Sequence, residues 1–230
     1  MRRGRATTVL LVVGTLLLTT VAGVAVAATF TCSTNPCFGT YLVDTITGTA
    51  SSETIEGYAG DDKIYGLGGN DWLKGNEGID KIYGGEGEDQ AEGGEGNDTI
   101  DLGPGDDGLG STGSTGGHGG PGNDTIKGGD GHDELYGEGG NDKLSGNAGG
   151  DNLTGGPGKN TYYGGDGNDT INADTAESAG GAKEWIYAGA GDDIIHAFDG
   201  LPDVIDCGGG NDVEVETDTF DTVASNCEAS

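Results

Sequence analysis

Aspartate recurs at nine-residue intervals over most of the chain, in a repeated setting of glycines. The units that begin at Gly93, Gly119, Gly128 and Gly164 share the pattern Gly-Gly-x-Gly-x-Asp-x-U-x, where U is large and apolar. Carboxylates and backbone carbonyls are the oxygen ligands that hard divalent cations prefer. The spacing therefore predicts a series of cation sites. A flexible turn with many carbonyls favours calcium over magnesium, which requires a small octahedral cage.

The glycines and the apolar residues indicate which elements hold these aspartates. Glycine at positions one, two and four allows backbone angles that side chains forbid, so the first six residues of a unit are predicted to form a tight turn. The last three are predicted to form a short strand whose apolar position eight faces inward. Examples are Ile64, Leu73, Ile82, Ile100, Ile126 and Leu135. Repeated turns and short strands predict an all-β fold, and the resemblance of the unit to the nonapeptide repeats of known solenoids implies a right-handed parallel β-roll in which two units make one coil.

Such a coil buries little apolar surface for its length. About two aliphatic side chains per coil face inward, and their burial does not obviously offset the entropy lost when the backbone is ordered. Stacked carboxylates add repulsion, which a divalent cation removes by neutralising and bridging them. We therefore expect the chain to be largely disordered in a calcium-poor cytoplasm and to fold in millimolar extracellular calcium.

This nonapeptide resembles the repeat of the RTX (repeats-in-toxin, hemolysin-type) proteins over roughly residues 39–224. In that family each ion sits between turns stacked on the same side, bound by aspartate carboxylates and glycine-turn carbonyls of repeats i and i+2. The resemblance implies several bound calcium ions, with these pairs of aspartates: Asp62 with Asp80, Asp71 with Asp89, Asp80 with Asp98, Asp89 with Asp107, Asp124 with Asp142, and Asp133 with Asp151. Pairs through Asn160, which interrupts the acidic series, are doubtful.

The metal ligands implied by the resemblance are position-six aspartates and position-four glycines. They are Asp62, Asp71, Asp80, Asp89, Asp98, Asp107, Asp124, Asp133, Asp142, Asp151, Asp169 and Asp193, with Gly60, Gly69, Gly78, Gly87, Gly96, Gly105, Gly122, Gly131, Gly140, Gly149 and Gly167.

The repeat register and the flanking composition divide the chain into seven segments. These are a signal peptide at 1–27, a short cysteine-containing segment at 28–38, a first repeat block at 39–110, a Gly/Ser/Thr break at 111–118, a second block at 119–172, an insertion at 173–178, and degenerate repeats with a disulfide-clamped C-terminal cap at 179–230. The break lacks the aspartate and shifts the frame by one residue, so it either separates two rolls or bulges from one. Glu214 is a polar residue at a predicted inward position.

Composition points to export and to cations as partners. A basic start, an apolar run and Ala25-Val26-Ala27 form a cleavable secretory signal, so the protein is predicted to be secreted, with no membrane insertion after cleavage. The formal net charge is −30, which makes nucleic acid and anionic membranes poor partners. The four cysteines fit an extracellular protein. The register places Cys207 and Cys227 one coil apart, within disulfide reach, and Cys32 with Cys37 would close a small loop. Free or intermolecular thiols are the alternative.

Other functions have weaker support. The strings of a zinc protease, a lipase or an EF-hand are absent, and about eleven residues outside signal and repeats are too few for a catalytic domain, so no enzymatic activity is expected. The three histidines lack zinc-site spacing. Tyrosines at position nine and tryptophans at position seven form an outward ladder that either packs across strands or meets an unknown glycan or protein. The alternatives to a calcium binder are an adhesin or matrix-like scaffold and a permanently disordered cation buffer.

Overall fold

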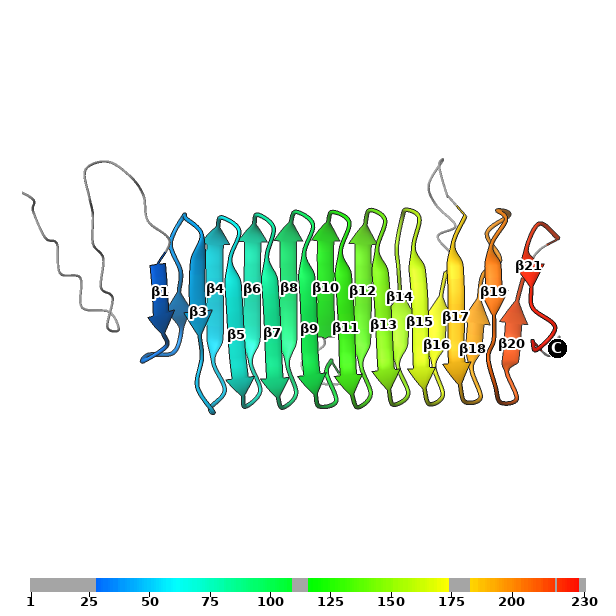
Figure 1. Cartoon of the computed structure of the whole chain (residues 1–230), viewed down its shortest axis with the longest axis horizontal. Coiled ribbons are helices and arrows are strands. Elements are labelled where there is room, and N and C mark those ends of the chain that lie inside the picture. The colour runs from blue at the N-terminus through cyan, green and yellow to red at the C-terminus, as the bar shows by residue number, and fades with distance from the viewer. Residues whose placement is uncertain (1–27, 109–115, 174–182, 218, 228–230) are drawn as a thin grey trace, which may run out of the picture.

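The computed structural model describes residues 28–108, 116–173, 183–217 and 219–227, and in these residues all regular elements are β-strands. The strands form two parallel sheets (Figure 1). The 11-stranded sheet contains β1 (Ala28–Thr31), β3 (Asp44–Thr47), β5 (Lys63–Gly68), β7 (Lys81–Glu86), β9 (Thr99–Pro104), β11 (Thr125–Asp130), β13 (Lys143–Ala148), β15 (Thr161–Asp166), β17 (Trp185–Ala190), β19 (Val204–Asp206) and β21 (Thr222–Val223). The 10-stranded sheet contains β2 (Cys37–Phe38), β4 (Thr54–Ala59), β6 (Trp72–Glu77), β8 (Gln90–Glu95), β10 (Gly116–Pro121), β12 (Glu134–Gly139), β14 (Asn152–Thr154), β16 (Thr170–Asn172), β18 (Ile194–His196) and β20 (Val213–Glu216).

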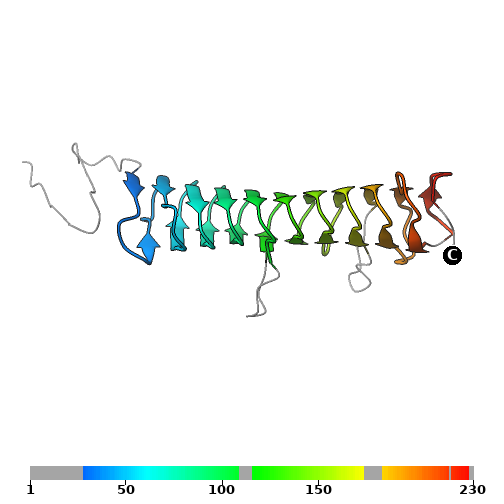
Figure 2. The ribbon, with the colours of Figure 1, turned by 90° about the horizontal axis from the view of Figure 1, so that it is seen from below.

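Consecutive strands alternate between the two sheets, so each coil contributes one strand to each sheet. Lys63 of β5 lies opposite Lys81 of β7, and Thr54 of β4 lies opposite Trp72 of β6. Two nine-residue units therefore form one coil, as the repeat predicts. Figure 2 shows the two layers of strands edge on, stacked into an elongated solenoid. The predicted parallel β-roll is confirmed.

Most strands are longer than the predicted three residues. A typical strand such as β5 has six residues and runs from position seven of one unit through position three of the next. Backbone groups at these added positions are hydrogen-bonded to the neighbouring coil, as for Gly48 N–H to Tyr65 O and Gly68 N–H to Thr49 O. Because backbone donors and acceptors in a packed structure need partners, the first glycines join the sheet, and only positions four to six are left for the turn.

Three positions of each unit point into the roll. Position eight supplies the apolar core, and the described side chains there are fully buried between Ile46 and Ile195, with Ala91 at 2% exposure. Positions six and one, an acid and a glycine, alternate with it, so the burial pattern along β7 is exposed, buried, partly buried, buried. The acids are therefore inside the molecule beside the apolar core, a more buried place than a solvent-exposed turn would give them.

The predicted break between the repeat blocks does not divide the roll. The structure places the last residues of that segment, Gly116, Gly117 and His118, in β10, which pairs with β8 before it and β12 after it. Both sheets run through without interruption. The alternative of two separate rolls is therefore excluded. The rest of the predicted break (111–115), the predicted signal peptide (1–27), Leu109 and residues 174–178 of the predicted insertion lie outside the described residues.

The C-terminal coils depart from the regular repeat. Between Ile194 and Ile195 the pairing of β18 with β20 shifts, so that Val215 lies opposite Ile195. A single bulged residue corrects the register that would otherwise pair the polar Glu214 with the core. Both predicted disulfides are formed, Cys32–Cys37 near the start of the roll and Cys207–Cys227 at its end, with Cα–Cα distances of 5.6 and 5.1 Å.

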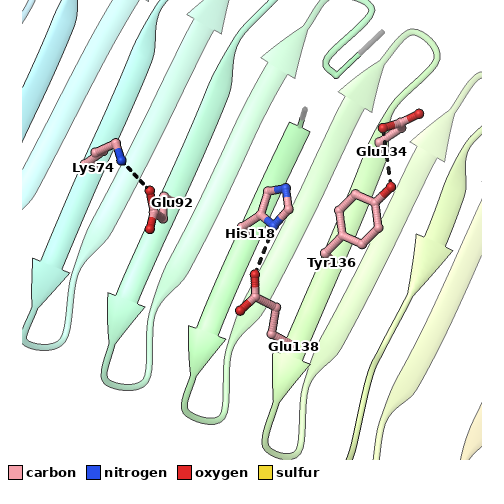
Figure 3. Close-up of polar contacts among 6 residues, drawn as sticks. All are labelled: Lys74, Glu92, His118, Glu134, Tyr136 and Glu138. Carbon is pink, nitrogen blue, oxygen red and sulfur yellow. Dashed lines mark hydrogen bonds and ion pairs between the residues drawn. The ribbon is translucent and has the colours of Figure 1, made fainter. Parts of the chain in front are cut away.

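Polar and aromatic side chains pair across the outer faces of the sheets. Lys74 and Glu92 form an ion pair of 2.6 Å, His118 Nδ1 lies 3.0 Å from Glu138, and the Tyr136 hydroxyl lies 3.4 Å from Glu134. Figure 3 shows these three contacts. The position-nine tyrosines stack in adjacent pairs, Tyr65 on Tyr83 and Tyr163 on Tyr187. This geometry supports cross-strand packing as the role of the outward ladder. Among the described residues, no helix is long and apolar enough to span a membrane.

Candidate metal centre

Two ladders of position-six side chains run along the roll, one at each edge where the chain passes between the sheets. In both, the backbone N–H of one member donates to the side-chain oxygen of the member one coil later, at 2.7 to 3.2 Å, as from Asp62 to Asp80 and from Asp71 to Asp89. The exception is Asn160, which donates to Glu184 through its side-chain Nδ2. The first ladder contains Asp44, Asp62, Asp80, Asp98, Asp124, Asp142, Asn160, Glu184, Asp203 and Asp221. The second contains Glu53, Asp71, Asp89, Asp107, Asp133, Asp151, Asp169, Asp193 and Asp212.

In most of these acids the second carboxylate oxygen is buried and accepts no hydrogen bond. This holds for Oδ2 of Asp62, Asp71, Asp80, Asp89, Asp98, Asp107, Asp124, Asp133, Asp142, Asp151, Asp169, Asp193 and Asp212, and for Oε2 of Glu184. A buried polar atom without a partner costs about 1–3 kcal/mol, and a charged one more. A regular series of such oxygens is therefore the strongest indication in the structure of a ligand set for a cation.

Most of these oxygens lie against a position-one glycine, at a place where a larger side chain would clash. A Cβ built on Gly75 would lie against Oδ2 of Asp80 and 2.6 Å from the carbonyl oxygen of Gly93. The same holds one coil later, where a Cβ on Gly93 would lie 2.5 Å from Asp98 Oδ2 and 2.7 Å from Gly119 O. We call this space, bordered by a position-one glycine, its own carboxylate and the carbonyl of the next coil, the glycine cradle.

The structure brings the predicted ligands together and adds members. All twelve predicted aspartates lie in the two ladders, and all six predicted pairs are neighbours in them. The pairs Asp98–Asp124 and Asp107–Asp133 bridge the break, and Asp169–Asp193 bridges the insertion. Sequence reasoning missed these three because their separations, 26 and 24 residues, do not match the repeat.

The predicted position-four glycines lie where the turns stack. The carbonyl oxygen of Gly60 faces Gly78, which has φ 139°, and that of Gly78 faces Gly96, which has φ 147°. The position-one glycines, which border the unpartnered Oδ2 atoms, were not among the predicted ligands. Their signal in the sequence was the glycine at position one of each clear repeat.

A row of polar side chains at position five was also not predicted. Oδ1 of Asn97 accepts the backbone N–H of Asn123, and Oδ1 of Asn123 accepts that of Asn141, both at 2.7 Å. These side chains reach toward the following coil, whereas the position-six carboxylates reach toward the preceding one. Because they are exposed, they join the turns without forming a buried site.

Burial sets the protonation of the position-six acids. Loss of solvent raises the pKa of Asp107 to about 8, of Asp62 and Asp98 to about 7, and of Asp89 to about 6, with neighbouring acids adding to the shift at all but Asp89 and the donated N–H opposing it. The metal-free fold thus holds protons that the unfolded chain releases near pH 4. Its stability is therefore lost as the pH rises from about 4 through 7, unless a cation neutralises the carboxylates.

The donor set fits calcium. Within the described residues no three His, Cys, Asp or Glu side chains form a metal-holding cluster. A ligand set would therefore combine one or two carboxylates with backbone carbonyls, all oxygen donors that hard cations accept in irregular geometry. Residues that would hold each ion are the position-six acids and the carbonyls of the stacked glycine turns.

A family model named RTX calcium-binding nonapeptide repeat (4 copies) matches residues 38–73, 74–109, 118–153, 139–171 and 178–214, which is more than half of the chain. The chain belongs to this RTX repeat family. It is therefore a calcium-binding repeat protein with a β-roll fold, a fold that is typically structural and not catalytic. RTX repeats are typical of secreted proteins, and the two disulfides fit an extracellular location. No curated protein matches the chain in sequence.

Calcium affinity is expected to fall as the pH is lowered from 8 to 5.5. Each carboxyl that must lose its proton weakens binding by roughly tenfold per pH unit below its pKa, and burial raises the pKa of Asp107 to about 8 and of Asp142 to about 7. Calorimetry at several pH values, in buffers of different ionisation enthalpy, would measure both the affinity and the protons released. An affinity that is constant over this range would contradict the burial of these acids.

Proposed function

We propose that the protein is a secreted calcium-binding protein whose β-roll folds when calcium binds, and that it has no catalytic role. The observation that carries this proposal is the long series of buried carboxylate oxygens without partners. Without a cation these atoms oppose folding at neutral pH, and with one they join adjacent coils. Calcium binding and folding are then a single event.

The segment assignments belong to the same proposal. Residues 1–27 act as a cleaved export signal, and residues 28–38 begin the mature chain with a disulfide-closed loop. The two repeat blocks form one calcium-dependent roll, and residues 179–230 close it with the second disulfide. Calcium is scarce inside the cell, so this acidic chain remains unfolded there. It folds after export, where calcium is available.

The proposed ligands are the predicted aspartates and position-four glycines, now extended by the position-one glycine cradles. The side chains on the outer faces of the sheets support a structural role for the roll, because the tyrosines and the charged residues there have partners within the roll. Calcium ions are the proposed partners, and nucleic acid is not, since the formal charge is −30.

Isothermal titration of the mature chain with calcium tests the proposal. We expect several ions to bind, with a large enthalpy because ordering of the backbone accompanies binding. Magnesium at the same concentration is the control and is expected to give little heat, since it dehydrates reluctantly and demands a regular octahedron. Equal binding of both ions, or no binding of calcium at millimolar concentration, would contradict the proposal.

A further inference from the structure

One unit of the first ladder differs from its neighbours at two inward positions. Asn160 takes the place of the aspartate at position six, and Tyr162 takes the place of Ile or Leu at position eight. Both side chains have no exposed surface, and Tyr162 is the largest fully buried side chain of the described roll. The next member of the ladder, Glu184, is an acid one methylene longer than aspartate and is 1% exposed.

The Asn160 amide is fixed in one orientation by its contacts. Its Oδ1 accepts the Asp142 N–H at 2.9 Å, as the aspartates of the ladder do for the residue one coil earlier. Its Nδ2 donates to the Gly156 carbonyl at 2.8 Å and to Glu184 Oε1 at 3.1 Å. The atom at the place of the unpartnered Oδ2 is therefore a nitrogen that carries hydrogens, and it cannot act as a ligand for a cation.

The glycine cradle of this unit is filled. A Cβ built on Gly155 would lie against the Tyr162 hydroxyl and 2.5 Å from Asn160 Nδ2. In the preceding coil, a Cβ on Gly137 meets only oxygens of the expected ligand set as its two nearest neighbours, Asp142 Oδ2 at 2.5 Å and Gly155 O at 2.6 Å. The phenol and the amide nitrogen thus lie where the ordinary unit has a carboxylate oxygen and a carbonyl oxygen.

The side chains of Asn160 and Tyr162 both donate to Glu184, and among these three side chains only Glu184 Oε2 is without a hydrogen-bond partner. The Tyr162 hydroxyl lies 3.3 Å from Glu184 Oε1, the same oxygen that accepts from Asn160. Two hydrogen-bond donors therefore converge on one oxygen of Glu184. An ordinary step of the ladder instead has two carboxylates and no side-chain donor. The negative charge of such a pair requires a cation to neutralise it.

We propose that the step of the first ladder between Asn160 and Glu184 binds no calcium. The hydrogen-bonded network of Asn160, Tyr162 and Glu184 takes the place of the ion. The inference rests on the proposed calcium binding of the other steps. It assigns one fewer ion to this ladder than a uniform repeat would give, and a joint between coils that does not depend on calcium.

Native mass spectrometry of the calcium-saturated mature chain tests this by counting bound ions. The double variant Asn160→Asp with Tyr162→Ile restores the ordinary unit, and we expect it to bind one more ion than the wild type. An unchanged count would overturn the inference, because the network would then not be what keeps calcium out.

Two single variants complete the test. Asn160→Ala is expected to keep the wild-type count, and a lower count would overturn the inference, since it would show an ion at this step. Asp142→Asn, the matched change one coil earlier, is expected to lose one ion, which shows that the method resolves a single site. A wild-type chain without any bound calcium would contradict the proposed function instead, so the two failures are distinguishable.

Discussion

Treatment of the mature chain with a calcium chelator at pH 7.5 is expected to abolish its β structure. The buried acids, whose pKa values are raised to about 6 to 8, would have to be inserted as charges or bound to protons that are scarce at this pH. Circular dichroism should change from a β spectrum to that of a coil. Small-angle scattering should show the radius of gyration rising toward about 48 Å, the value for an unfolded chain of this length.

Acid pH is the informative control for that experiment. At pH 4.5 in the same chelator the buried acids can be protonated, so part of the compact β structure should return without calcium. Readdition of calcium at pH 7.5 should restore the full spectrum. A chelated protein that stays compact at pH 7.5, low salt and without bound metal would show that the carboxylate ladders do not control folding.

Substitution of Asp98 by Asn is expected to act in opposite directions with and without calcium. The amide keeps an Oδ1 that can accept the Asp80 N–H, an interaction of 2.8 Å in the wild type, but it loses the charged Oδ2 ligand. In calcium the variant should unfold at lower denaturant concentration and bind one ion fewer. In chelator it should require less acid to fold than the wild type, because burial raises the pKa of Asp98 to about 7 and an amide escapes that cost.

Asp106→Asn is the matched control for Asp98→Asn. Asp106 is an exposed residue at position five, and its Oδ1 accepts the His132 N–H at 3.1 Å, a bond that asparagine can keep. The same change of charge should therefore leave the calcium midpoint and the ion count nearly unchanged. Equal shifts in the two variants would mean that net charge, and not the ladder, determines the calcium response.

The sequence predicted the periodic part of the structure well. A nine-residue period with Ile or Leu at position eight was enough to place residues such as Ile64 and Ile82 in the core and to pair the strands that carry them. The aspartates were correctly expected to meet those two repeats away. These features follow from alternation and stacking, which depend on residue spacing alone.

Features that depend on how irregular segments pack in three dimensions could not be predicted from residue spacing. The pairing of Asp98 with Asp124 requires the extra residues between the blocks to leave the coil, and spacing does not say which ones do. The bulge that brings Val215 to the core, and the addition of three residues to strands such as β5, are set by backbone hydrogen bonds. The filled cradle at Gly155 depends on the direction of the Asn160 amide, which only its partners determine.

The two disulfides lie where a linear stack is weakest. Every interior coil pairs with two neighbours, whereas β1 and β21 each pair with one strand of their sheet. In a one-dimensional array the end units have half the interface and fray first. Cys32–Cys37 closes a loop at one end, and Cys207–Cys227 ties the last turns together at the other. Unzipping from either end therefore meets a covalent bond before it reaches the ion-bridged interior.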